Sequence, residues 1–210
     1  MDRAFYRSVI TRVVVLFSVG MSSGCAPLLS SSFNSIRDPD YDASSIGKLA
    51  VFPIRNSWIP DDKANRLLTE LANAIDRKND NVAVIGWDFS HSILVEKNLQ
   101  KKWDDFLRDY WKTGKPDSNV IREVGSAIDV DAIMQCEITY IMRRPGSFWE
   151  SGGATYVTLH YMMFGVREGK LLWEASGAAV GITGRFQTSP PSVYSVASEA
   201  QRSITSSLPF

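Results

Sequence analysis

Cysteine and histidine are scarce in this chain, and neither sign of charge dominates. Of its 210 residues two are cysteines and two are histidines, while 23 lysines and arginines balance 23 aspartates and glutamates. His91 and His160 are too few for a metal site that several imidazoles build. The balanced charge lacks the basic excess of nucleic-acid-binding proteins. We therefore expect no metal site and no nucleic-acid partner.

The N-terminus also lacks an apolar run long enough to cross a bilayer. Residues 13–21 are apolar over about nine positions, whereas a transmembrane helix needs about 20. Three arginines precede this run, and the small residues Ser22, Ser23 and Gly24 follow it. This order is typical of a secretory signal peptide. The sequence therefore predicts a leader over residues 1–24.

The residues that end this leader resemble a bacterial lipobox, a motif that reads Leu, Ala or Ser, Gly or Ala, and Cys. Ser23, Gly24 and Cys25 match its last three positions, and Ser22 stands where leucine is usual. The resemblance implies that Cys25 is the first mature residue and carries acyl chains such as palmitate, which together anchor a protein stably. Ala26 follows instead of aspartate, and this implies the outer membrane. An ordinary cleaved signal peptide and a short uncleaved anchor are the alternatives.

Residues 26–45 are rich in serine, aspartate, proline and asparagine and have no sustained period. This composition is typical of a flexible linker, whose mean reach over some 20 residues is about 25 Å. We therefore expect residues 25–45 to be a lipidated cysteine and a flexible tether. Residues 46–210 are then a single α+β domain that faces the periplasm.

Periodicity divides residues 46–210 into strands and helices. Strands are expected at residues 48–54, 82–85, 131–142, 154–166 and 170–176. Helices are expected at residues 60–78, 90–112 with a break, 118–128 and 192–208. The order β-α-β-α-α-β-β-β-α predicts an α+β fold with a single mixed sheet of about five strands, backed by helices.

Three features that suggest chemistry have plainer structural explanations. The strand at residues 131–142 should turn one apolar face inward, formed by Ala132, Met134, Cys136, Ile138 and Tyr140. Cys136 is therefore expected to be an inert buried thiol. His160 lies in the middle of a strand and is expected to be a structural or surface histidine. The helical spacing of Trp103, Phe106 and Tyr110 favours a core stripe over a ligand stack.

Three segments, in this order, resemble a superfamily of bacterial lipoproteins. Residues 46–54 read IGKLAVFPI and are similar to its first strand. Residues 124–133 read VGSAIDVDAI and resemble its helix-to-strand step, and residues 164–173 read FGVREGKLLW and resemble its hairpin. The superfamily contains the curli secretion channel and the lipoprotein activators of peptidoglycan synthases. The resemblance implies a mixed sheet backed by helices, no catalytic centre, and work through protein–protein contact or oligomerisation.

Motifs of catalysis and of cofactor binding are missing. The chain has no glycine-rich phosphate loop, no His-Glu-x-x-His, no Cys-x-x-Cys and no Gly-x-Ser-x-Gly. Asp104 and Asp105 are neighbouring carboxylates on a predicted solvated helix face. We expect no enzymatic activity and no cofactor. An unrecognised envelope hydrolase with scattered carboxylates is the weakest alternative.

The best candidate contact residues follow the strand at residues 131–142. Arg143 and Arg144 precede Phe148 and Trp149 in a turn flanked by glycine and serine. Arginine and aromatic residues are favoured interface anchors, although Phe148 and Trp149 could instead fold back onto the sheet.

The sequence favours a membrane-anchored, non-catalytic module of the cell envelope that binds or regulates an envelope protein. It would work alone or as a homo-oligomer. A component of an outer-membrane secretion or transport assembly is the second interpretation.

Overall fold

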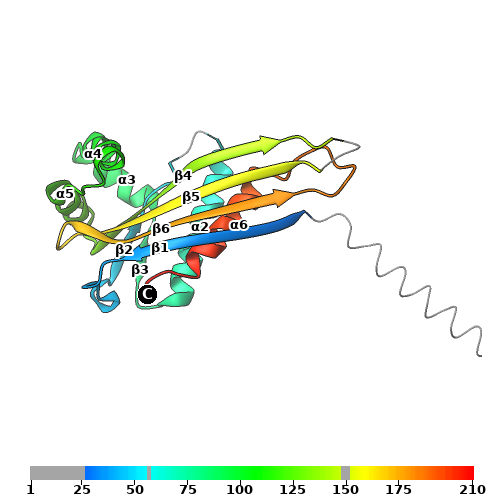
Figure 1. The fold of residues 1–210 in the computed structure, drawn as a ribbon. Coiled ribbons are helices and arrows are strands. Elements are labelled where there is room, and N and C mark those ends of the chain that lie inside the picture. The colour runs from blue at the N-terminus through cyan, green and yellow to red at the C-terminus, as the bar shows by residue number, and fades with distance from the viewer. Residues whose placement is uncertain (1–26, 56–57, 148–151) are drawn as a thin grey trace, which may run out of the picture.

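The computed structural model describes residues 27–55, 58–147 and 152–210, and it confirms the α+β class. Within these residues, one mixed sheet of six strands has the order β1-β6-β5-β4-β2-β3. The strands are β1 (Leu28–Arg37), β2 (Lys48–Val51), β3 (Ala83–Ile85), β4 (Ala132–Arg144), β5 (Ala154–Gly165) and β6 (Lys170–Ile182). The helices are α2 (Asp61–Lys78), α3 (Trp87–Glu96), α4 (Gln100–Thr113), α5 (Ser118–Ile128), α6 (Val193–Thr205) and the short 3₁₀ helix η1 (Ala43–Ser45). In Figure 1 the four long strands β1, β6, β5 and β4 lie side by side and extend beyond α3, α4 and α5.

The sheet separates two apolar cores, and β2 contributes to both. Leu49 and Val51 lie in the core that contains α2 and α6, and Ala50 and Phe52 lie in the core that contains α3, α4 and α5. Successive side chains of a strand point to opposite faces, so a strand buried on both faces is apolar throughout. β2 ends just before Pro53, whose nitrogen cannot donate to a ladder.

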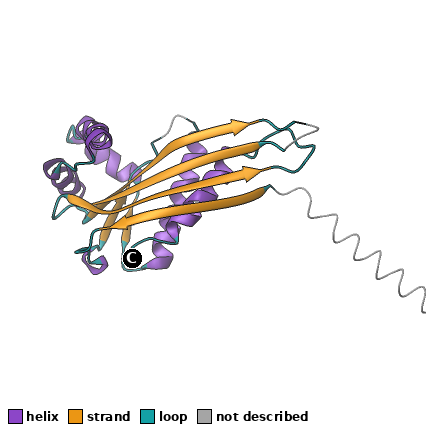
Figure 2. Cartoon of the chain, viewed as in Figure 1, coloured by secondary structure: helices purple, strands orange, loops and turns teal. Residues whose placement is uncertain are grey.

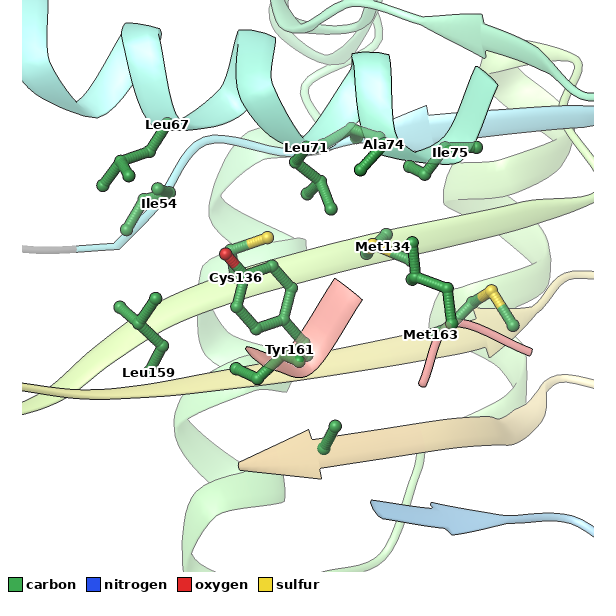
Figure 3. Close-up of a cluster of buried hydrophobic side chains, with 14 of the residues drawn as sticks. Ile54, Leu67, Leu71, Ala74, Ile75, Met134, Cys136, Leu159, Tyr161 and Met163 are labelled. Carbon is green, nitrogen blue, oxygen red and sulfur yellow. The ribbon is translucent and has the colours of Figure 1, made fainter. Parts of the chain in front are cut away.

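The first core lies between the sheet and the helices α2 and α6. Leu67, Leu71 and Ile75 recur at helical spacing on α2 and are buried. Figure 3 shows them on the side of α2 that faces Cys136 of β4 and Tyr161 of β5. Fully burying a side chain of this kind contributes about 1.5–3 kcal/mol relative to leaving it exposed.

The second core confirms that the aromatic stripe of α4 is structural. Trp103, Phe106 and Tyr110 are buried, and each packs edge-to-face on Phe164 of β5, with ring centroids 6.0, 5.3 and 5.4 Å from it. This geometry is the one that aromatic pairs prefer. The indole nitrogen of Trp103 donates to Oε1 of Gln135, 3.1 Å away.

The predicted interruption between the helices over residues 90–112 is confirmed. α3 ends at Glu96 and α4 begins at Gln100, with Asn98 between them at a positive φ of 55°. Asp117 then caps α5, because its side chain accepts hydrogen bonds from the backbone N–H groups of Asn119 and Val120.

The prediction of a flexible tether over residues 25–45 is wrong for most of that segment. Residues 28–37 form β1, which pairs antiparallel with β6 over all ten positions. An edge strand is held by backbone pairing and needs little side-chain burial. The serine-rich sequence of β1 therefore lacks the apolar alternation by which a strand is recognised. β1 begins three positions after Cys25, so no tether of some 20 residues separates that cysteine from the sheet.

Candidate functional site

One face of the long strands β4, β5, β6 and β1 carries no helix of the described chain over the half that lies away from α3, α4 and α5. We call that half the outer half of the strands and the other the inner half. On β5, Val157 and Leu159 point into the core of α2 and α6, so Tyr156 and Thr158 lie on the opposite face. Figures 1 and 2 show α3, α4 and α5 gathered near the other end of the strands. We call this area the open face. It consists of Tyr140, Met142, Arg144, Tyr156, Thr158, Ala178, Val180, Ile182, Leu28, Ser30, Ser32 and Asn34.

The strand register sorts the open face into rows that cross β4, β5, β6 and β1. The first central row is Tyr140, Thr158, Ala178 and Ser32. The second central row is Met142, Tyr156, Val180 and Ser30. Residues directly opposite on neighbouring strands have Cβ atoms about 4.5–5.5 Å apart, so each row is a continuous strip of contacting side chains.

The two central rows combine exposed apolar side chains with hydroxyl groups. Tyr140 is 50% exposed and Met142 is 42% exposed. A groove of about 310 Å³ lies over these rows, lined mainly by Tyr140, Tyr156 and the residues opposite them on β6 and β1. No side chain in either row is charged. The strip therefore suits a neutral, partly apolar surface with hydrogen-bonding groups.

A histidine and a carboxylate close the inner end of the open face. Nε2 of His160 on β5 lies 2.7 Å from Oε1 of Glu174 on β6, and the ring of Trp111 from α4 lies 4.7 Å from the His160 ring. Burial lowers the pKa of His160, while the nearby carboxylates of Glu174 and Glu137 oppose this shift and are outweighed. His160 is 8% exposed and ties β5 to β6 and α4, so the expectation of a structural histidine is confirmed.

Ser176 pairs in register with His160, but the two do not form a nucleophile and its base. The hydroxyl of Ser176 donates to the backbone carbonyl of Leu159 at 3.4 Å. Glu174 holds Nε2 of His160, and Nδ1 makes no hydrogen bond among the described residues. A catalytic serine must donate its hydroxyl hydrogen bond to a histidine nitrogen that acts as the base, and Ser176 does not donate to His160. Among all the residues that the structure describes, no group of three His, Cys, Asp or Glu side chains is placed to hold a metal ion.

The predicted contact residues fall in different places. Arg143 and Arg144 form the exposed end of β4, and only Arg144 is on the open face. Cys25, Phe148 and Trp149 lie outside the described residues.

The other cysteine behaves as expected. Cys136 is buried in the first core, and burial raises the pKa of its thiol far above the ordinary range, as expected for an inert cysteine.

Tyr140 is on the opposite face from the one expected. The sequence alternation placed it inward with Cys136, but the register of β4 shifts between Ile138 and Tyr140. Such a β-bulge adds a residue and reverses the faces beyond it. The inward apolar residues on its two sides are Ile138 and Ile141, three positions apart. That spacing was the only signal of the bulge in the sequence.

No protein-family model and no curated protein sequence matches this chain. Solved structures of similar fold include the PelC dodecamer from Paraburkholderia phytofirmans, with 13% identity, a TM-score of 0.49, and coverage of 84% of this chain and 96% of that one. The lipoprotein GNA1162 from Neisseria meningitidis has 15% identity and a TM-score of 0.41, over 64% of this chain and 83% of that one. These likenesses are distant, so no function is carried over from them.

Within residues 27–55, 58–147 and 152–210, no helix has both the length and the apolar character that crossing a membrane requires.

Proposed function

We propose that this chain is a lipid-anchored protein of the cell envelope that binds another protein through its open face and catalyses no reaction. The observation that carries the proposal is the pair of neutral central rows, which begin on β4 with the exposed side chains of Tyr140 and Met142. Contiguous exposed apolar patches on soluble domains mark interaction sites. The acyl chains that the lipobox-like sequence implies on Cys25 supply the anchor, which we assign to the outer membrane with the domain facing the periplasm.

The chemistry of the open face favours a protein partner. Tyrosine and methionine are enriched at protein interfaces. The rows stand on a paired sheet whose backbone is already ordered, so binding costs little backbone entropy. Arg144 lies at the outer end of the strip and Glu174 lies beyond its inner end. Opposite charges at the two ends would fix the orientation of a partner that presents the complementary pair.

The neighbourhood of His160 supports a non-catalytic role. Its contacts with Glu174 and Trp111 stabilise the inner end of the sheet, and the hydroxyl of Ser176 is engaged with the backbone. Whether the bound protein belongs to a secretion or transport assembly depends on its identity, which the following experiment provides.

Site-specific photo-crosslinking in living cells tests the proposal. A benzoylphenylalanine replaces Tyr140 on the open face or, as a matched control, Phe89 on α3, an aromatic residue that is 58% exposed. We expect one prominent adduct with an envelope protein from position 140 and none of that mass from position 89. The same adduct from both positions would contradict the proposal, and so would an adduct from position 140 between two copies of this chain.

A further inference from the structure

The geometry points to a second contact surface: we infer that the outer end of the long strands rests on the lipid bilayer itself. This inference depends on the proposed acylation of Cys25 and specifies how the anchored domain sits. The occupant of the surface is a membrane that contains anionic lipid.

The length of chain between the anchor and the sheet is the first argument. Leu28, the first residue of β1, follows Cys25 by three positions. Three fully extended residues span at most about 10–11 Å. An acylated Cys25 therefore holds the start of β1 within about one headgroup layer of the lipid, and the domain cannot move away on a long linker.

The register shows which other residues this constraint brings to the membrane. Leu28 pairs with Ile182 at the end of β6, and Ala154 of β5 connects this row to Arg144 at the end of β4. Figure 1 shows the start of β1 and the ends of β4 and β6 at one end of the sheet, away from α3, α4 and α5. Three strand spacings of about 4.8 Å put Arg144 about 14 Å from Leu28. We call this end the outer tip.

The outer tip has the composition of a membrane-surface contact. Its exposed apolar side chains are Leu28, Ile182 and Phe186, which are 72%, 40% and 64% exposed. Its described charged side chains are Arg143, Arg144 and Arg185, and residues 27–29, 143–147, 152–154 and 182–191 contain no aspartate or glutamate. Glu150 lies outside the described residues. Apolar side chains among arginines are typical of segments that bind anionic lipid surfaces.

Two loops meet at the outer tip, one between β4 and β5 and one between β6 and α6. Backbone hydrogen bonds hold their described parts together. The N–H of Gly146 donates to the carbonyl of Thr188 at 2.8 Å, and the N–H of Thr183 donates to the carbonyl of Gly153 at 2.9 Å. A Cβ on Gly152 would lie 1.8 Å from the carbonyl oxygen of Thr183, so only glycine permits this approach. The tip therefore presents its apolar and basic side chains from one packed surface.

The opposite end of the strands carries charges of both signs, in contrast to the described part of the outer tip, whose charged side chains are all arginines. Exposed Asp40 and Asp42 follow β1, and the same end holds Asp131 and two carboxylates that pair with basic residues: Asp129 with Lys48 and Glu168 with Arg167. Ten residues of β1 span about 33 Å, so these carboxylates stand well clear of the lipid when the outer tip is docked. The open face then runs along the membrane normal, accessible to a partner in the periplasm.

Depth-dependent quenching tests the orientation. A bimane label is placed on Ile182→Cys at the outer tip or on Glu168→Cys at the opposite end, in the acylated full chain, where the other cysteine, Cys136, is buried. Each protein is reconstituted in vesicles of phosphatidylethanolamine and phosphatidylglycerol that contain nitroxide-labelled lipid, and its fold and acyl mass are checked first. We expect at least about twofold quenching at position 182 and none at position 168.

Two further results separate the parts of the inference. Arg185→Glu should reduce the quenching at position 182, while the control Arg167→Glu, at the opposite end, should not. Equal quenching at positions 182 and 168 in an acylated protein, or an unchanged signal in Arg185→Glu, would overturn the docked orientation and leave the anchor intact. A chain without acyl mass would refute the anchor, and with it the proposed function.

Discussion

The hydroxyl of Tyr161 on β5 donates a hydrogen bond to Oε1 of Gln201 on α6, 2.6 Å away in the interior. Nε2 of the same glutamine donates to the backbone carbonyl of Leu67 on α2, 2.9 Å away. One buried amide therefore joins the sheet to both helices that cover its first face. This connection holds α2 and α6 together on one face of the sheet.

Tyr161→Phe should lower the free energy of unfolding by about 1–3 kcal/mol, because it leaves Oε1 of Gln201 buried without a donor. Tyr140→Phe is the matched control, since the Tyr140 side chain is half exposed and its hydroxyl can be replaced by water. Urea denaturation of both variants provides the comparison. Equal stabilities for the two would show that the buried hydrogen bond contributes nothing.

Gly125→Ala should destabilise the protein by about 1–3 kcal/mol through overpacking. A Cβ at this position of α5 would lie 2.0 Å from Cγ2 and 2.9 Å from Cβ of Val166, so the helix must move off the sheet. Ser126→Ala, on the exposed side of the same helix, should leave stability within about 0.5 kcal/mol. A thermal midpoint for Gly125→Ala equal to that of Ser126→Ala would contradict the packing.

Stability should fall at acidic pH in a way that depends on His160. Burial lowers the pKa of His160 below its usual value of 6.5, so the folded state takes up the proton less readily than the unfolded state. The contribution of neutral, buried His160 to the free energy of unfolding is complete above about pH 6.5 and is lost as the pH falls below that value. His160→Gln should remove this dependence.

The measurement is the difference in unfolding free energy between the wild type and His160→Gln, taken from about pH 7.5 down to about pH 5. Subtracting the variant cancels the titration of the other groups. The advantage of the wild type should shrink as the pH falls. An advantage that grows would mean that the ion pair with Glu174 outweighs the burial of the imidazole.

Cys136 should not react with a maleimide or with iodoacetamide in the folded protein. Its side chain is buried, and burial raises the pKa of the thiol, so the reactive thiolate is both inaccessible and scarce. Intact mass after labelling should show no adduct in buffer and one in strong denaturant. Rapid modification of the folded chain would show that this part of the first core opens readily.

The sequence predicted the elements whose pattern is local. The apolar run of β2 and the helical stripe of α4 follow from side-chain periodicity alone, and the apolar residues of both lie in the two cores. β1 was missed because its stability comes from pairing with β6, about 145 positions away, and its serines show no apolar period. A strand of this kind becomes visible only when its partner is known.

The open face was beyond local inference for two reasons. The bulge after Ile138 moves Tyr140 to the other side of the sheet, and the alternation of apolar and polar residues does not predict this bulge. Which face the helices cover depends on contacts such as Tyr161 with Gln201, which join distant segments. Arg144 was identified from composition, but its place on the open face depends on that bulge.

Binding affinity at the centre of the open face tests the central claim most directly. Ala178 is exposed in the first central row, between Thr158 and Ser32. The dissociation constant for the protein crosslinked at position 140 should be at least about tenfold weaker for Ala178→Arg, which is ~1.4 kcal/mol, because the arginine puts bulk and charge into a neutral strip. Ser126→Arg on α5 should bind like the wild type. Equal affinity for Ala178→Arg and the wild type, with the fold intact, would contradict the account.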